Sequence, residues 1–325
     1  MADRQSLDAT FFAFRKRERG GVLTMATITY LVVSFAMLGL FVYFNWHAAI
    51  DYFNWVAAMG ANAGKADPTD PNAVFAAMMP PASVMAVGPT YFLLLLATYI
   101  LIAAWEAACL RWMIRGEVKG LFGLSLGADT WRVYLGYWIW FVFYFVAYFA
   151  FLIVAVGAGI GVGVAAQGNP DAALPSALIV CLIVLAALAA WIYLAVRLAP
   201  AAATSVARRR FAFFDAWKVS RGRFWGLFGA FLLISFMFVV LCAAVCIGGV
   251  VTLAMATAGQ ITQSGEPHSM EEVMRLVGAP QILVPGIALY AVYAVSVFLV
   301  FIAFFGINAR AAALALEEGK ITAES

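Results

Sequence analysis

The chain has 325 residues, of which 65% are hydrophobic and only 11% are charged. Soluble proteins contain roughly 45–50% apolar and about 25% charged residues, so this chain has too few charges to cover soluble cores of its length. The composition excludes a water-soluble enzyme, and it excludes a disordered chain, which would be poor in aliphatic and aromatic residues. The class that remains is a polytopic integral membrane protein.

Six stretches are long and apolar enough to cross a membrane as helices, each of which needs about 20 mostly apolar residues. Strands of a membrane barrel would alternate apolar and polar residues, and runs such as Ala177 to Ala190 do not. The expected spans cover residues 22–44, 87–110, 133–158, 175–196, 224–250 and 280–307. The expected outward loops cover residues 45–86, 167–174 and 259–279. We therefore predict an all-α fold in a single integral membrane domain, residues 1–325.

Two of the outward loops carry signals for helix starts. In the first, Asp70 and Pro71 are suited to the start of a short helix over residues 72–79, which Pro80 would end. In the last, Ser269 precedes acidic residues that favour the first turn of a helix. The second loop is short, so spans three and four are expected to be antiparallel neighbours.

The orientation follows from the positions of the 20 Lys and Arg residues, because cytoplasmic loops are enriched in them. Eighteen lie in the two tails and in the loops after spans two and four, and only Lys65 and Arg275 lie in the opposite loops. We therefore predict a multi-pass protein of the bacterial inner membrane with both termini in the cytoplasm. Its basic residues flank apolar spans, which favours contact with anionic lipids over nucleic acid.

The third and fifth apolar runs are longer than a bilayer requires. Residues 133–166 and 224–258 would each reach about 50 Å as helices. Such helices must protrude, tilt strongly or break. The third run contains Gly157, Gly159, Gly161 and Gly163, a pattern typical of close helix packing, with a hinge as the alternative.

A short motif occurs twice, each time directly before an odd-numbered span. Residues 129–136 and residues 215–222 share Asp, Trp, a basic residue, Val and Gly at the same spacing. The spans that precede the motifs end on Arg111 and Arg197, and span six ends on Arg310. With a degenerate third copy at residues 7–12, the pattern predicts three repeats of a cytoplasmic juxtamembrane helix followed by a transmembrane hairpin.

The residue types of the motif suit the boundary between membrane and water. The Asp and the basic residue three positions later can form an ion pair on one helix face, and Trp favours the interface. In the second copy Phe213, Phe214 and Trp217 are predicted to share one face, with Asp215 and Lys218 opposite. Candidate contacts to lipid head groups or a partner protein are Trp131, Arg132, Arg208, Arg209, Arg210, Trp217, Lys218 and Arg221. A simple helix cap with an aromatic belt is the alternative.

The repeated hairpin, the spans that end on arginine and the segment Phe213-Phe214-Asp215-Ala216-Trp217-Lys218 resemble a broad bacterial family. That family is labelled the membrane domain of glycerophosphoryl diester phosphodiesterases, with related six-span inner-membrane proteins. Where such a domain is joined to an enzyme, the resemblance implies that catalysis belongs to a separate soluble α/β barrel. This chain has no room for that barrel, so we expect the membrane fold without the hydrolase activity.

A catalytic or metal site is not expected from the titratable residues. The two histidines, His47 and His268, fall in outward loops without an obvious nucleophile, although His47 lies one helical turn from Asp51. Cys242 and Cys246 are one turn apart, but no His or carboxylate lies nearby in sequence to complete a metal site. We predict a non-catalytic protein without a cofactor or metal.

One ionisable residue lies well inside a predicted span, where such groups are costly and usually functional. Glu106 is placed toward the cytoplasmic end of span two, at the depth of several span-end residues. A polar pocket could comprise Glu106, Arg111, Arg197, Asn308 and Arg310. The favoured function is a membrane scaffold or lipid-interacting module. The alternative is a transporter or channel for a small or amphipathic solute, with Glu106 at its cytoplasmic mouth.

Overall fold

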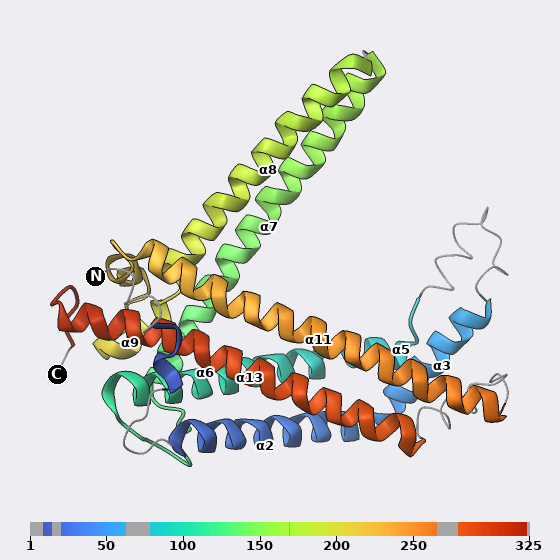
Figure 1. Ribbon diagram of the computed structural model, residues 1–325, viewed down its shortest axis with the longest axis horizontal. Coiled ribbons are helices and arrows are strands. Elements are labelled where there is room, and N and C mark those ends of the chain that lie inside the picture. The colour runs from blue at the N-terminus through green and yellow to red at the C-terminus, as the bar shows by residue number, and fades with distance from the viewer. Residues whose placement is uncertain (1–8, 15–20, 63–78, 169, 265–278, 324–325) are drawn as a thin grey trace. The chain divides into compact units, whose positions relative to one another are not determined.

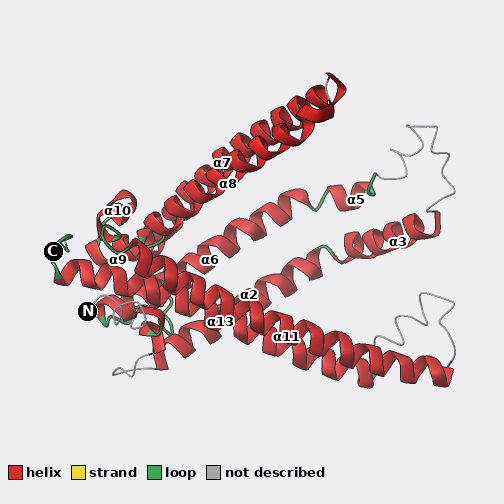
Figure 2. Ribbon diagram, turned by 45° about the horizontal axis from the view of Figure 1, so that its top comes forward, coloured by secondary structure: helices red, strands yellow, loops and turns green. Residues whose placement is uncertain are grey.

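The computed structural model describes residues 9–14, 21–62, 79–168, 170–264 and 279–323 (Figure 1). Apart from one isolated bridge between Leu121 and Leu124, these residues form helices, turns and loops (Figure 2). The long helices are α2 (Gly21–Phe44), α6 (Gly88–Arg115), α7 (Ala128–Gly168), α8 (Pro170–Leu198), α11 (Phe224–Ser264) and α13 (Pro280–Glu317). The shorter helices are η1 (Phe12–Phe14), α3 (Trp46–Asn62), α5 (Ala82–Met85), α9 (Ala201–Arg208), η2 (Phe213–Asp215) and α10 (Ala216–Val219).

Each predicted span is found as one of the six long helices. All six are long and apolar enough to cross a membrane. Their surfaces are apolar: Phe35, Ile153 and Val239, for example, are at least 60% exposed. Apolar surface on this scale is stable in lipid and not in water. The protein is therefore an all-α, multi-pass integral membrane protein.

The chain divides into two compact units. The first comprises Met1–Arg19, Cys109–Glu117 and Leu135–Ser325, and the second comprises Gly20–Ala108 and Val118–Tyr134. Helices α6 and α7 contribute residues to both units. The division concerns packing within the chain, and the single membrane domain stays a prediction.

Consecutive spans pack against each other in pairs, as the predicted hairpins require. At least one aromatic contact joins the two helices of each pair. The contacts, with the distances between ring centroids, are Tyr30–Trp105 at 4.9 Å, Tyr144–Trp191 at 5.1 Å and Phe231–Phe304 at 5.6 Å. The α2–α6 pair also has a hydrogen bond of 3.0 Å from Trp105 Nε1 to Thr27 Oγ1. Large aromatic rings thus supply packing between neighbouring helices in all three pairs.

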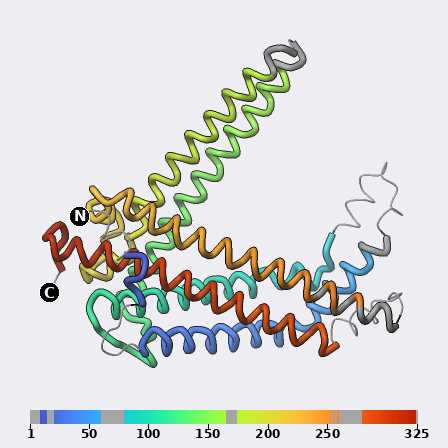
Figure 3. Tube along the Cα trace, in the orientation of Figure 1, coloured from blue at the N-terminus to red at the C-terminus, as the bar shows by residue number. Residues whose placement is uncertain are grey.

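The third and fifth spans do not break. Helices α7 and α11 each run for 41 residues, or about 60 Å, without interruption (Figure 3). Gly157, Gly159, Gly161 and Gly163 lie inside the continuous helix α7, so the alternative of a break is wrong, whereas a hinge stays a prediction. The predicted close packing at these glycines is also wrong within the described chain, because a Cβ atom built on any of them would meet nothing within 4 Å.

Two predicted outward loops contain more helix than the sequence indicated. In the first, α3 begins at Trp46, directly after Asn45, and α5 begins after Pro81. The predicted loop at residues 167–174 is almost entirely helical, because α7 ends at Gly168 and α8 begins at Pro170.

In the third outward loop, α11 continues to Ser264, inside the predicted loop. The predicted helix at residues 72–79, apart from Met79, and the predicted cap at Ser269 lie outside the described residues.

Candidate functional site

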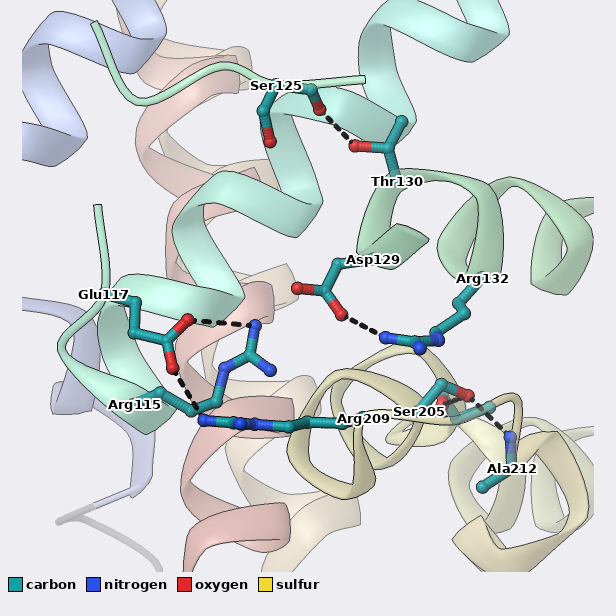
Figure 4. A network of polar contacts seen from close by, with 10 residues as sticks. Arg115, Glu117, Ser125, Asp129, Thr130, Arg132, Ser205, Arg209 and Ala212 are labelled. Carbon is teal, nitrogen blue, oxygen red and sulfur yellow. Dashed lines mark hydrogen bonds and ion pairs between the residues drawn. The ribbon is translucent and has the colours of Figure 1, made fainter. Parts of the chain in front are cut away.

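The residues between α8 and α11 contain most of the candidate contacts, and helix α9 anchors them. Helix α9 is built from small residues that are almost all buried, and it packs against α13. It ends where Arg209 adopts a left-handed conformation at φ 58°. The backbone N–H of Ala212 then donates a hydrogen bond of 3.1 Å to Ser205 Oγ (Figure 4). These contacts hold the chain close to α9 after the helix ends.

The Arg208 side chain joins two other segments of the chain, at Asp215 and Thr322. Its side chain is buried, with an ion pair to Asp215 and a hydrogen bond of 3.3 Å from Nε to the backbone oxygen of Thr322. A buried charge requires such partners because the loss of hydration is costly. These internal contacts compete with the predicted contact of Arg208 with lipid or a partner. Binding of lipid or a partner therefore depends on the exposed residues beside it, Arg209 and Arg210.

Asp215 is the centre of the second copy of the motif. Lys218 lies 2.9 Å away, which confirms the predicted ion pair between positions three apart, and Arg210 lies at 3.9 Å. The hydrogen bond from Lys218 and the positive charge of Arg208 lower the pKa of the Asp215 carboxyl, although burial acts in the opposite direction. The carboxylate thus stays ionised at neutral pH and joins three basic side chains.

The first copy of the motif forms the first turns of α7. Asp129 accepts a hydrogen bond of 2.6 Å from Arg132, which confirms the second predicted ion pair (Figure 4). Thr130 Oγ1 donates to the backbone oxygen of Ser125 at 2.5 Å and fastens the start of the helix. Trp131 is exposed, as an interfacial Trp would be.

The predicted common aromatic face of the second copy is wrong for Phe213. This ring is buried and contacts the rings of Trp140 and Phe143 at centroid distances of 6.0 and 6.2 Å. Phe214 is 65% exposed, and Trp217 is also exposed. Phe213 therefore anchors the segment to α7, and only the other two rings are available at the surface.

Basic and aromatic side chains alternate at the surface of residues 209–225, which we call the basic–aromatic segment. Arg209 forms an ion pair of 2.9 Å with Glu117, which Arg115 also approaches at 3.7 Å (Figure 4). The exposed members of the segment are Arg209, Arg210, Phe211, Phe214, Trp217, Lys218, Arg221 and Trp225. The sequence analysis did not single out Phe211 or Trp225, although aromatic residues beside arginines are a recognisable interfacial signal.

The residues of the predicted polar pocket belong to different units. Glu106, which is buried, is in the second unit, and Arg111, Arg197, Asn308 and Arg310 are in the first. Within the first unit Arg197 and Arg310 have separate surroundings. The pocket therefore stays a prediction.

Two of the three span-end arginines, Arg197 and Arg310, lie over aromatic rings. The Arg197 guanidinium carbon is 5.0 Å from the centre of the Trp217 ring, and that of Arg310 is 5.4 Å from the centre of the Phe12 ring. Both distances are within the range of cation–π contacts. Sequence analysis missed these pairs because the partners are distant along the chain. The recurrence of an arginine at a span end, together with an aromatic residue in each copy of the motif, is the signal that could have suggested them.

The degenerate third copy also packs closely, although Asp8 lies outside the described residues. Phe12 and Ala13 are buried. A Cβ atom built on Gly306 of α13 would lie 2.7 Å from Ala13 Cβ and 2.9 Å from its backbone nitrogen. Only glycine permits this approach of η1 to α13.

The candidate catalytic groups remain scattered. His47 is exposed on α3, while Asp51 accepts a hydrogen bond of 2.6 Å from Ser83 Oγ. His268 lies outside the described residues. Cys242 and Cys246 are free thiols, and the described ranges contain no group of three or more His, Cys, Asp or Glu side chains suited to hold a metal.

The chain matches no protein-family model, no curated protein and no solved structure. The resemblance to the membrane domain of glycerophosphoryl diester phosphodiesterases therefore stays a prediction.

Proposed function

We propose that the protein is a non-catalytic membrane scaffold that recruits anionic lipids, and through them a partner, to its basic–aromatic segment. The proposal includes a location in the bacterial inner membrane with both termini in the cytoplasm, where anionic head groups meet this segment. It also includes a relationship to the six-span membrane domains named above.

The observation that carries the proposal is the surface of the basic–aromatic segment. Phe214 and Trp225 are 65% and 77% exposed, and Arg210, Lys218 and Arg221 are exposed between them. The rest of the segment is anchored by Arg208 and Phe213, so these exposed rings are held outside the packed interior. Aromatic rings beside cations are suited to the head-group region, where each cation contributes about 1 kcal/mol near an anionic surface.

The experiment removes charge from this surface and measures which lipids the protein retains. The double variant Arg210→Gln with Arg221→Gln should lower the ratio of phosphatidylglycerol to phosphatidylcholine that co-purifies from mixed vesicles. Each lost charge corresponds to about a fivefold weaker attraction for the anionic lipid. Arg221 has no ion pair within the described residues, and Arg210 is only the most distant of the three basic partners of Asp215, which keeps Arg208 and Lys218. An unchanged melting temperature of the double variant checks that the fold is intact.

The matched control removes two charges from the predicted outward loops, Lys65→Gln with Arg275→Gln. It should leave the retained phosphatidylglycerol unchanged. Equal losses in the two double variants, or no loss in either, would contradict both the orientation and the lipid-binding role.

Transport is the second candidate function, and the burial of Glu106 within the apolar helix α6 favours it. Ionisable side chains within membrane-spanning helices are costly to place there and are usually functional. Uptake of a fluorescent amphipathic cation into vesicles that contain the protein tests this alternative. Uptake no faster than in empty vesicles, or equal uptake by wild type and Glu106→Gln, would count against it.

A further inference from the structure

Arg197 lies at the end of α8, where its guanidinium group contacts two aromatic rings. Its guanidinium carbon is 5.3 Å from the centre of the Tyr193 ring and 5.0 Å from that of Trp217. The Tyr193 ring also contacts Phe224 at a centroid distance of 5.1 Å. Ser220 Oγ donates a hydrogen bond of 2.9 Å to the Arg197 backbone oxygen, which attaches the second motif to this helix end. Side chain and backbone are therefore both held in place.

The positive charge of Arg197 is not balanced within the described part of the chain. No carboxylate there forms an ion pair with it, whereas Arg310, at the corresponding point of span six, lies 3.6 Å from Glu317. The Nη1 atom of Arg197 is buried and has no acceptor among these residues. A partly dehydrated guanidinium in such surroundings favours an anion nearby.

The hydroxyl group of Tyr193 offers that anion a directed donor. Its oxygen accepts hydrogen bonds of 3.2 Å from Nε and 3.1 Å from Nη2 of Arg197. Because a phenol oxygen has two lone pairs and one hydrogen, the hydrogen is left for another acceptor, and no described residue provides one. The adjacent cation strengthens this donor by polarising the O–H bond. Tyr193 is 39% exposed, so part of the residue is open to a ligand.

We infer that Tyr193 and Arg197 form a specific site for the phosphate of an anionic phospholipid. The Tyr193 hydroxyl donates to the head-group phosphate, Arg197 balances its charge, and the exposed Trp217 ring contacts the glycerol and upper acyl region. This inference rests on the proposed lipid-binding function and assigns one lipid to a defined place. The surrounding rings favour a lipid over a soluble phosphate, because Trp and Tyr concentrate at membrane interfaces.

The test titrates phosphatidylglycerol into the delipidated, detergent-solubilised full chain and counts bound lipids by native mass spectrometry. Tyr193→Phe keeps the ring and its contact with Arg197 but removes the hydroxyl group. We expect about a tenfold weaker apparent affinity for the first lipid, since a hydrogen bond to a charged group is lost. Arg197→Gln should weaken binding at least as much. The matched control is Tyr91→Phe, whose exposed ring contacts Phe41 on α2 and should leave the affinity unchanged.

Three outcomes would overturn the inference. The first is wild-type affinity for phosphatidylglycerol in Tyr193→Phe, whose folding is checked by an unchanged melting temperature. The second is an equal loss in the Tyr91→Phe control. The third is displacement of the lipid by glycerol 3-phosphate at comparable concentration, which would assign the site to a soluble phosphate. A loss in Arg210→Gln with Arg221→Gln, but none in Tyr193→Phe, would remove this site and keep the broader lipid-binding function.

Discussion

The two copies of the repeated motif have the same residue pattern but different backbones. In the first copy, residues 129–136 are all part of α7, which continues into the membrane. In the second, α10 ends at Val219, Gly222 adopts φ 78°, and α11 begins at Phe224. The comparison shows that the local ion pair forms in either context, whereas the continuation of the helix depends on other residues.

Ser220 accounts for part of this difference. Its hydroxyl group bonds to the backbone oxygens of Arg197 and Trp217 at 2.9 and 3.3 Å. Serine side chains that bond to the backbone compete with regular helix hydrogen bonds, and a glycine two residues later permits the turn. The first copy has Tyr134 at the corresponding position, which offers no such bond at this range. The second copy therefore becomes a junction, while the first remains a helix start.

The largest expected effect is a loss of stability when the Asp215 carboxylate is removed, compared with removal of its exposed partner Lys218. Asp215→Asn leaves the buried Arg208 without a full counter-charge and should lower the free energy of unfolding by about 3 kcal/mol. Lys218→Gln removes a more exposed partner of the same carboxylate and should cost less than about 1 kcal/mol. Denaturant titration of the detergent-solubilised protein measures both. Equal losses would contradict the role assigned to Arg208.

Replacement of the motif glycine by alanine should raise the stability of the protein in the first copy and lower it in the second. Gly136→Ala lies inside a helix, and its Cβ would be 3.8 Å from Phe213 Cδ2, an ordinary contact, so stability should rise by about 0.5–1 kcal/mol. Gly222→Ala places a side chain at positive φ and should lower stability by about 1 kcal/mol. Thermal unfolding in detergent measures the two shifts. Shifts of the same sign would mean that the two backbones do not differ as described.

The stability that Asp215 contributes to the second copy should also depend on pH. Because its partners hold the pKa of Asp215 below the usual range, its contribution to stability is present above the unfolded-state pKa of about 3.9. That contribution is lost as the pH falls through the lower pKa of the folded state. The melting temperatures of wild type and Asp215→Asn should therefore converge below pH about 4. A gap that stays constant from pH 6 to about pH 2.5 would contradict the assignment.

Glu318 is a second carboxylate whose contribution to stability depends on pH. The hydrogen bond from Lys320 and the charge of Arg223 lower its pKa as well, so its contribution is lost with acid in the same direction. Glu318 is unchanged in Asp215→Asn, so its contribution cancels from the difference between the two proteins.

The features that sequence predicted well are those set by composition or by neighbours along the chain. Apolar runs located the six spans because a helix in lipid must bury its backbone polar groups within itself. The spacing of Asp215 and Lys218 predicted their ion pair because residues three apart share a helix face. Helix α3 was missed because His47, Asp51 and Asn54 interrupt its apolar residues, so no transmembrane run is visible.

The features that sequence missed depend on contacts between distant segments. Arg208 seemed available to lipid because it stands in a run of three arginines. Its burial arises from Asp215 and from Thr322, which lies 114 residues away. The contact between Arg197 and Trp217 likewise forms only because the second motif turns back toward the end of α8. The pattern of charges along the sequence does not show which distant segments fold back into contact.

The close approach of Ala13 to Gly306 constrains the order of assembly during biosynthesis. The segment around Ala13 is translated well before Gly306, its docking surface on α13. Phe12 and Ala13 therefore lack their final cover until the chain has been translated and inserted past Gly306. A product truncated before Gly306 would leave this segment undocked.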